Sequence, residues 1–398
     1  MSRGDQRVRD RLAHAPLPDE DGARARARRV AAAAFEAREP APRPPHRPLL
    51  AAVLATVLAA VLLAVGLTAP GDAVGDWVRR LVAPEARPTR PALDSLPAAG
   101  RLLVSGTGGA WVVRRDGSRR RLGPYADAAW SPRGLFVAVA RGRQLLAVDP
   151  RGSVRWALAR PSAVRLPRWS PPDGFRIAYL SGRSLRVVAG DGSGDRLLAP
   201  AVVRVAPAWR PGVAHQVAYV DERGRVVLAE ADSGRVLWRR RAGSERLLSL
   251  EWSGDGERLM VAARLGVRLL DVRGGERRRL RTAPGSEVGA AALSPTGDRV
   301  AVLQSIPGGG RDTLVLHPVG GPRADPRVLF SGPALRSATW SPDGRWLLVT
   351  APGADQWIFV RVGPRGGLAV ASDIARQFDP RGAARAPRVE GWCCPPGR

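Results

Sequence analysis

Two amino-acid types are missing from this sequence altogether. The chain contains no lysine and no asparagine, so all 63 of its Lys+Arg residues are arginine. A Walker-type phosphate loop and Schiff-base chemistry both need a lysine, and N-glycosylation needs an asparagine. These three kinds of site are therefore excluded. The accompanying excess of Ala, Arg, Gly, Pro and Val is a coding bias that indicates a GC-rich genome.

Cysteine and histidine are scarce as well. The two cysteines, Cys393 and Cys394, are adjacent, whereas a zinc site needs four ligands at suitable spacing. The four histidines are far apart in the chain and suggest no ligand cluster: His14, His46, His215 and His317. We therefore expect no metal site. The cysteine pair could form a vicinal disulfide, form an intermolecular bridge or stay reduced.

Sequence motifs that carry catalysis are also lacking. There is no G-x-S-x-G nucleophile elbow, no His-rich metal pattern and no Asp-rich calcium loop. The segment DGSGD at 191–195 could hold a cation, but its composition favours a hairpin turn. Carboxylate pairs in a central channel could cleave glycosides, although sequence alone does not show which acids would face it. We expect no catalytic residue and no cofactor.

The formal net charge is +27. Such a charge can indicate binding of nucleic acid or of an anionic surface. Here, however, arginine is scattered through every segment, so biased residue usage on solvated faces is the simpler interpretation. Nucleic acid is not an expected partner.

One apolar run is long enough to cross a membrane. Residues 49–69 carry no charge, and 21 residues of helix span a bilayer core of about 30 Å. The 48 residues before it are too many for the n-region of a signal peptide, so we predict an uncleaved, single-pass signal anchor in the plasma membrane. Residues 1–48, with eleven arginines and a short helix at 20–39, form the predicted cytoplasmic tail. Residues 70–100 would be an interfacial helix (72–82) and a Pro-rich stalk, with the C-terminal bulk outside.

The remainder of the chain repeats a short pattern. Six anchors of the W-S-P-D-G type recur 39 to 47 residues apart, the period of a four-stranded propeller blade: Trp130, Trp169, Trp209, Trp252, Leu293 and Trp340. Ser, Pro and Gly at these spacings favour a type I turn, and a short apolar run follows each turn, such as LFVAVA at 135–140. We predict an all-β propeller in which each anchor joins the first strand of a blade to the second. The tryptophans would be structural packing residues, with sugar stacking as the functional alternative.

The two ends of the repeat region complement each other. Residues 101–122 supply a second, third and fourth strand, whereas RVEGWCCPPGR at 388–398 supplies a first strand and an anchor, Trp392. Together they make a seventh blade, so we predict a ring closed by the C-terminal strand, with six blades as the alternative. Arginine runs fall on three predicted fourth strands, at 119–121, 239–241 and 277–279.

The anchor followed by an apolar strand resembles the repeat of TolB-like, WD-repeat-like bacterial β-propellers over about residues 101–398. With the composition, this resemblance suggests an actinobacterial-like source. Two further segments, D-x-x-G-x-V-x-W at 149–156 and D-S-G-R-V-L-W at 232–238, look like quinoprotein-type repeats. Those enzymes bring a cofactor pocket that we cannot identify here, so we interpret both segments as strand-turn-strand packing.

Three functions remain open. The resemblance implies a non-enzymatic platform that binds a protein or an envelope polymer, and this is the first hypothesis. The second is a transmembrane sensor, for example an anti-sigma-like regulator, that couples the propeller to a cytoplasmic partner of the tail. The third is a hydrolase or quinoprotein-like enzyme, which the lack of catalytic motifs disfavours.

Overall fold

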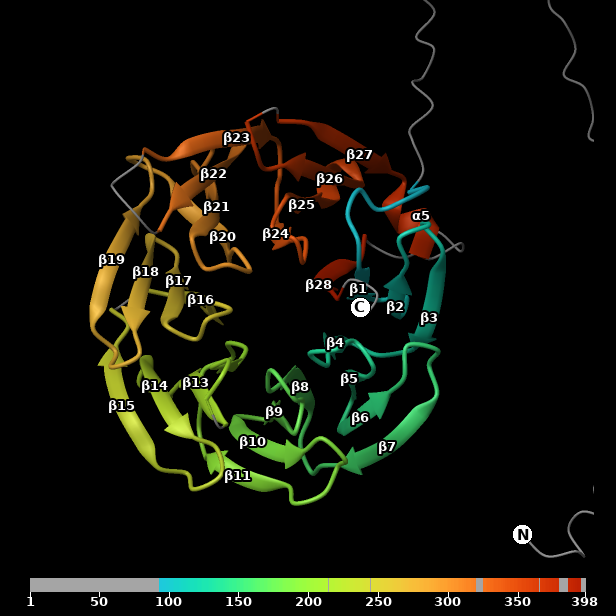
Figure 1. The fold of residues 1–398 in the computed structure, drawn as a ribbon, viewed down its shortest axis with the longest axis vertical. Coiled ribbons are helices and arrows are strands. Elements are labelled where there is room, and N and C mark those ends of the chain that lie inside the picture. The colour runs from blue at the N-terminus through green and yellow to red at the C-terminus, as the bar shows by residue number, and fades with distance from the viewer. Residues whose placement is uncertain are drawn as a thin grey trace, which may run out of the picture. The chain divides into compact units, whose positions relative to one another are not determined.

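The computed structural model of the chain describes residues 93–213, 215–243, 245–319, 325–364, 366–378 and 386–394. The predicted cytoplasmic tail, signal anchor and interfacial helix lie outside these residues. Within the described part, no helix is long and apolar enough to cross a membrane. What the structure describes is a ring of β-sheets (Figure 1).

Seven antiparallel four-stranded sheets follow one another around the ring (Figure 1). We number the blades by their anchors, so that blade 1 carries Trp130 and blade 7 carries Trp392. Blade 1 consists of β4 (Asp127–Trp130), β5 (Val137–Arg141), β6 (Gln144–Val148) and β7 (Val154–Ala159). Blade 2 consists of β8 (Val164–Trp169), β9 (Arg176–Ser181), β10 (Ser184–Ala189) and β11 (Arg196–Ala199). Blade 3 consists of β12 (Ala208–Trp209), β13 (Gln216–Val220), β14 (Arg225–Glu230) and β15 (Val236–Arg241).

The second half of the ring has the same plan. Blade 4 consists of β16 (Leu247–Trp252), β17 (Arg258–Ala263), β18 (Gly266–Asp271) and β19 (Glu276–Arg281). Blade 5 consists of β20 (Glu287–Leu293), β21 (Arg299–Ser305), β22 (Asp312–Pro318) and β23 (Arg327–Gly332). Blade 6 consists of β24 (Ser337–Trp340), β25 (Trp346–Ala351), β26 (Gln356–Arg361) and β27 (Leu368–Ser372). Blade 7 consists of β28 (Arg388–Cys393), β1 (Arg101–Gly106), β2 (Gly109–Val113) and β3 (Arg119–Gly123). A short 3-10 helix, η1 (Pro352–Ala354), joins β25 to β26, and one helix, α5 (Ile374–Phe378), precedes β28.

The ring is closed by the C-terminal strand, as the sequence predicts. β28 pairs antiparallel with β1, and Trp392 lies opposite Leu102. The first strands of successive blades contact one another all the way round, and β28 in turn contacts β4. The seven-bladed prediction is therefore confirmed, and the six-bladed alternative is wrong.

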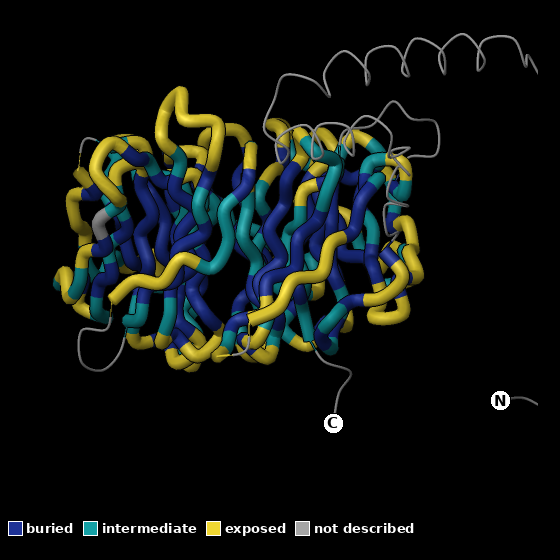
Figure 2. Tube along the Cα trace, turned by 90° about the horizontal axis from the view of Figure 1, so that it is seen from above, coloured by how far each residue is buried: buried dark blue, intermediate teal, exposed yellow. Residues whose placement is uncertain are grey.

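The core lies between neighbouring blades. Second and third strands are apolar on both faces, as in β17, where only the first residue is not fully buried. Figure 2 shows these buried segments through the middle of the ring and the exposed residues mainly in the loops at its two sides. The three arginine runs lie on β3, β15 and β19, the outermost strands of their blades, as predicted.

The anchors form the predicted turns between first and second strands. In four of them the serine carbonyl accepts a hydrogen bond from the glycine N–H three residues later, at 2.8 to 2.9 Å. The buried serine hydroxyl also accepts an N–H at the start of the second strand, from the first strand residue or, in blade 1, from the residue before it: this occurs at Ser131, Ser170, Ser253, Ser294 and Ser341. The serine thus satisfies backbone polar groups that would otherwise be buried without a partner.

Two expectations about segment boundaries need correction. β5 begins at Val137, so Leu135 and Phe136 remain in the anchor turn and are exposed rather than part of a strand. Residues 93–100, assigned to the stalk, lie on the propeller instead, because Leu93 and Leu96 are buried in the same core cluster as Trp392. Apolar residues between prolines can pack on a neighbouring core as well as extend a linker.

Candidate functional site

One side of the ring carries the anchor turns and the turns between third and fourth strands. We call it the anchor face. In an antiparallel meander alternate turns lie at the same end of the strands, so these two sets of turns must share a face. The turns between second and third strands lie on the opposite face.

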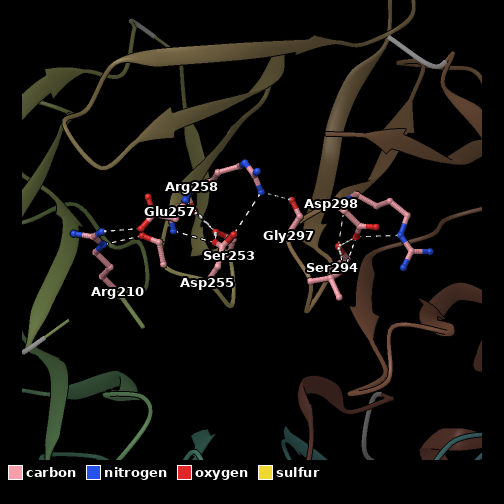
Figure 3. Close-up of polar contacts among 11 residues, drawn as sticks. Arg210, Ser253, Asp255, Glu257, Arg258, Ser294, Gly297 and Asp298 are labelled. Carbon is pink, nitrogen blue, oxygen red and sulfur yellow. Dashed lines mark hydrogen bonds and ion pairs between the residues drawn. The ribbon is translucent and has the colours of Figure 1, made fainter. Parts of the chain in front are cut away.

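Arginines join neighbouring blades on the anchor face (Figure 3). Arg258 of blade 4 donates a hydrogen bond to the carbonyl of the anchor glycine in blade 5 (3.2 Å), and Arg299 of blade 5 does the same to blade 6 (3.4 Å). Arg101 of blade 7 makes this contact with blade 1 (2.8 Å). In blade 3, Arg210 replaces the anchor serine and reaches the glycine of blade 4 (2.7 Å) and Glu257 (3.3 Å).

Some of these guanidinium groups also cover a tryptophan of the next blade. The distance from the guanidinium carbon to the ring centroid is 4.9 to 5.5 Å in three pairs: Arg101 over Trp130, Arg210 over Trp252 and Arg299 over Trp340. Each cation–π contact of this kind contributes about 0.5–1 kcal/mol at exposed sites and more when desolvated. The planar fork of arginine allows both contacts at once, which lysine could not match.

Blades 1 and 6 have an aromatic residue in place of this arginine. In blade 1 it is Phe136, the residue before β5, whose N–H binds the anchor serine just as those of Arg258 and Arg299 do in their blades. In blade 6 it is Trp346. The ring of Phe136 stacks on Trp169, the anchor of blade 2, with centroids 6.5 Å apart and an interplanar angle of 23°. A benzyl group cannot donate a hydrogen bond, so an apolar contact replaces the arginine bridge between blades 1 and 2.

A cleft of about 790 Å³ opens at this point of the ring. Its walls carry Leu135 and Phe136 from blade 1, Phe175 from blade 2, and the indoles of Trp156 and Trp169. Leu135 and Phe175 are each 60% exposed, which is unusual for large apolar side chains in a fold that buries most others. Contiguous exposed apolar surface of this kind marks interaction sites.

The back of the cleft is held rigidly. Trp156 on β7 donates its indole N–H to the carbonyl of Gly190 in blade 2 (2.9 Å). A Cβ on Gly192 would lie 2.8 Å from the ring, so this glycine allows the close approach. Trp238 on β15 likewise donates to Val272 of blade 4 (2.9 Å). The two segments that look like quinoprotein-type repeats are therefore blade-packing elements, as interpreted from the sequence.

Most polar side chains around the cleft already have partners. Arg155 pairs with Asp149 (2.9 Å), and Arg176 pairs with Asp232 (2.9 Å). The carboxylate of Asp191 accepts hydrogen bonds from Ser193. Among the described residues that line the cleft, the charged side chains without a hydrogen bond or ion pair are Arg133, on the blade 1 wall, and Asp173, on the blade 2 wall. The cleft is thus an apolar surface with one free charge of each sign.

An ion cluster centred on Asp232 flanks the cleft. Burial raises the pKa of this carboxyl, but hydrogen bonds from His215, Arg176 and Arg196 outweigh burial and lower the pKa to about 2. Arg176 of blade 2 thereby binds the turn between β14 and β15 of blade 3. The cluster is a structural clamp between blades 2 and 3.

The segment DGSGD forms the turn between β10 and β11, as its composition predicts. The carboxylate of Asp195 accepts hydrogen bonds from Tyr179 and Arg186, and it also pairs with Arg160 (2.8 Å). Its oxygens are therefore occupied by protein donors. In the described part of the chain, no group of three or more His, Cys, Asp or Glu side chains could hold a metal ion.

Acidic side chains lie on several first strands, the innermost of each blade. Burial raises the pKa of Glu251 to about 7, although its carboxylate accepts the N–H of Leu293 (2.9 Å). On β4 and β28, Asp127 and Glu390 both pair with Arg388, at 2.9 and 3.2 Å. The carboxylates of blades 1 and 7 are therefore bound to one guanidinium group.

The predicted anchor residues are brought into equivalent places around the ring. All are buried except Trp130, which is half-buried. Trp209 and Trp340 donate their indole N–H to carbonyls of the preceding blade, at 2.8 and 3.0 Å. Trp392 packs edge-on against Phe359 with centroids 5.8 Å apart. Leu293 fills the anchor position of blade 5 without an indole.

The two cysteines lie at the end of β28. A disulfide joins Cys393 to Cys394 in the structure, and the Sγ of Cys394 contacts the carbonyl oxygen of Pro132 at 3.2 Å. Both side chains are half-buried. Of the histidines, His215 belongs to the Asp232 cluster, and His317 is buried between blades 4 and 5, where burial lowers its pKa.

The cleft itself escapes sequence reasoning, although one signal was present. The sixth residue after the anchor is arginine in blades 4 and 5, but it is phenylalanine in both blades that form the cleft, Phe136 in blade 1 and Phe175 in blade 2. Aligning that position would have marked these two residues, although blade 6 also has an aromatic residue there, Trp346. Trp156 gives no comparable signal.

Comparisons with known proteins support the fold and no more. No protein-family profile and no curated protein matches the chain. Among solved structures, a chain of "Crystal Structure of Mitotic Checkpoint Complex" is similar with a TM-score of 0.50 and 20% identity, over 61% of this chain and 75% of that chain. The Myceliophteria thermophila Cps50 (Swd1) beta-propeller domain is similar with a TM-score of 0.50 and 13% identity, over 63% of this chain and 86% of that one. The chain has the fold of a seven-bladed β-propeller.

Proposed function

We propose that the chain is a membrane-anchored, extracytoplasmic, non-enzymatic propeller that binds a partner protein in the cleft between blades 1 and 2. The observation that carries the proposal is a cleft with exposed apolar walls, where Phe136 stacks on Trp169 and no arginine bridges the two anchor turns. One of the similar structures is the Mitotic Checkpoint Complex, which is compatible with a role of this propeller in an assembly.

The chemistry of the cleft favours a polypeptide over an envelope polysaccharide. A sugar chain presents many hydroxyl groups, which need hydrogen-bonding side chains around an aromatic platform. Here the polar groups are largely used within the protein, and Arg133 and Asp173 are the free charged groups. A protein segment with one or two large apolar side chains and a flanking charge complements such a surface.

The anchor and the location rest on the apolar run at 49–69. They can be tested with the native cysteines, because Cys393 and Cys394 are the two cysteines of the chain and both lie on the propeller. After mild reduction of intact cells, a membrane-impermeant maleimide should label the protein. Labelling that requires cell lysis would place the propeller inside.

Partner binding is tested with the full chain and two variants in which exposed apolar side chains, matched in exposure, are replaced by aspartate. The cleft variant carries Leu135→Asp and Phe175→Asp. The control carries Leu265→Asp and Ile306→Asp, which replace side chains 58% and 56% exposed in turns of the opposite face. Proteins captured by the wild type and the control but not by the cleft variant are then purified, and their affinity for each form is measured directly.

We expect the cleft variant to bind such a partner at least about tenfold more weakly than the control does, since apolar anchors dominate interface energies. Equal affinities for all three forms would refute the assignment of the cleft. If isolated envelope polysaccharide bound to the wild type and the control but not to the cleft variant, and no captured protein behaved in this way, the partner would be a polymer.

A further inference from the structure

The cysteine pair contacts the wall of the cleft. The Sγ of Cys394 lies 3.2 Å from the carbonyl oxygen of Pro132, and that of Cys393 lies 3.9 Å from the carbonyl oxygen of Ser131. Ser131 and Pro132 begin the anchor turn of blade 1 and line the cleft. A Cβ on Gly134 of the same turn would also touch the Sγ of Cys394.

The position of Cys393 in the repeat explains why a thiol can stand there. It follows Trp392 as the anchor serine follows the tryptophan of other blades, where the hydroxyl holds the first N–H of the second strand. In blade 7 the second strand is β1, which begins at Arg101 in a distant part of the sequence. Cys393 therefore does not have to bind the first N–H of a strand that follows it in the chain, which is what the serine does in the other blades.

The backbone at the pair is held in an unfavourable conformation. Cys394 has a φ of 47°, in the left-handed region that residues other than glycine rarely adopt. A covalent link between adjacent side chains restricts the backbone between them. Without the link, Cys394 can return to an extended conformation, which would carry its sulfur away from Pro132.

We propose that Cys393–Cys394 is a thiol–disulfide exchange site for a soluble dithiol, and that its redox state sets the mobility of the 131–136 turn. Through that turn it would control the shape of the cleft, and only this last step rests on the proposed function. The site takes a dithiol reductant as its substrate class.

The exchange proceeds in two displacements. A thiolate of the dithiol attacks the Sγ of Cys393, the disulfide bond breaks, and the electron pair leaves with the Sγ of Cys394 as a thiolate, which takes a proton from water. The guanidinium of Arg101 also borders Gly134, so a cation lies near this leaving group and favours its departure. The second thiolate of the dithiol then displaces Cys393. Two electrons and two protons pass to the cysteines, and the dithiol closes to a cyclic disulfide.

The test is amide hydrogen exchange of the full chain, oxidised and after treatment with dithiothreitol. We expect exchange in the 131–136 turn to become about tenfold faster on reduction, as the left-handed residue relaxes. The turn at 294–297 in blade 5 is the internal control and should not change. The variant Cys393→Ser/Cys394→Ser should behave like reduced wild type in both conditions.

Three results would overturn the proposal. One is unchanged exchange at 131–136 after the release of both thiols has been verified by alkylation and mass spectrometry. Another is the same change in the serine variant on treatment, which would show an effect of the reductant itself. The third is thiols that react only in denaturant, which would mean that the pair is closed to a soluble dithiol. No partner is needed for this assay, so its outcome is independent of whether the cleft binds a protein.

Discussion

The closing strand β28 offers the most direct test of the architecture. Trp392 is 7% exposed and packs against Leu102, Trp357 and Phe359 in one core cluster. Replacing a buried tryptophan by alanine costs about 3–5 kcal/mol. Because whole domains are stable by only about 5–15 kcal/mol, Trp392→Ala should remove at least about a fifth of the total free energy of unfolding.

Ending the chain at residue 387 should be more severe. This truncation removes Trp392 together with the pairing of β28 to β1, and it exposes the edge of β1 to aggregation. It also removes Arg388, which pairs with Asp127 of blade 1 (2.9 Å). We expect the truncated protein to lose cooperative unfolding or to aggregate.

The measurement is equilibrium urea denaturation, followed by near-ultraviolet circular dichroism. The matched control is a chain that ends at residue 394 and so keeps all of β28; its midpoint should equal that of the wild type. If the chain ending at 387 unfolded at the wild-type midpoint, β28 would not close the ring, and the reasoning from complementary ends would be wrong.

Three further predictions concern the cleft, the inner strands and blade packing. Phe136→Arg should raise the midpoint of urea denaturation, because the new arginine can form an inter-blade bridge worth about 1 kcal/mol, and it should weaken partner binding. A lower midpoint would show that position 136 is not equivalent to the positions of the bridging arginines in other blades. Burial raises the pKa of Glu251 from 4.5 to about 7, so its ionisation destabilises the folded state as pH rises through that window. In denaturation at a series of pH values, the free energy of unfolding of Glu251→Gln should therefore rise relative to that of the wild type between pH 4.5 and 7, by at most about 3 kcal/mol. A difference that stays constant with pH would contradict this. In thermal melts, Gly192→Ala should destabilise the protein by about 1–3 kcal/mol more than Gly194→Ala does. Both glycines have positive φ, but a Cβ at Gly192 would meet the indole of Trp156 in blade 1, whereas a Cβ at Gly194 would meet nothing within 4 Å. Equal losses of stability would refute this packing.

The architecture could be predicted because a propeller blade is a local object. Each anchor, its turn and the strand that follows lie within about ten residues, and the pattern returns at a regular period. The closure could be predicted because 101–122 and 388–398 lack complementary parts of one blade. Neither prediction depends on which side chains of neighbouring blades contact one another.

The cleft could not be predicted in the same way, because its walls belong to two blades. Phe136 and Trp169 are 33 residues apart in the sequence and meet only when blades 1 and 2 pack. The apolar run at 135–140 misled the strand assignment as well. Its first two residues, Leu135 and Phe136, line the cleft, and β5 starts only at Val137.

The interpretation of the arginines also changes with the structure. Taken alone, the net charge of +27 pointed to solvated faces in a biased composition. Several of these arginines instead join adjacent blades on the anchor face, where they bind a backbone carbonyl and cover a tryptophan. Such bridges link blade 7 to 1, 3 to 4, 4 to 5 and 5 to 6. Between blades 1 and 2, Phe136 provides an apolar ring instead of a guanidinium, so the bridge is missing and an exposed aromatic surface takes its place. A position where a blade forgoes a stabilising contact that several others make is where we expect selection for binding to have acted.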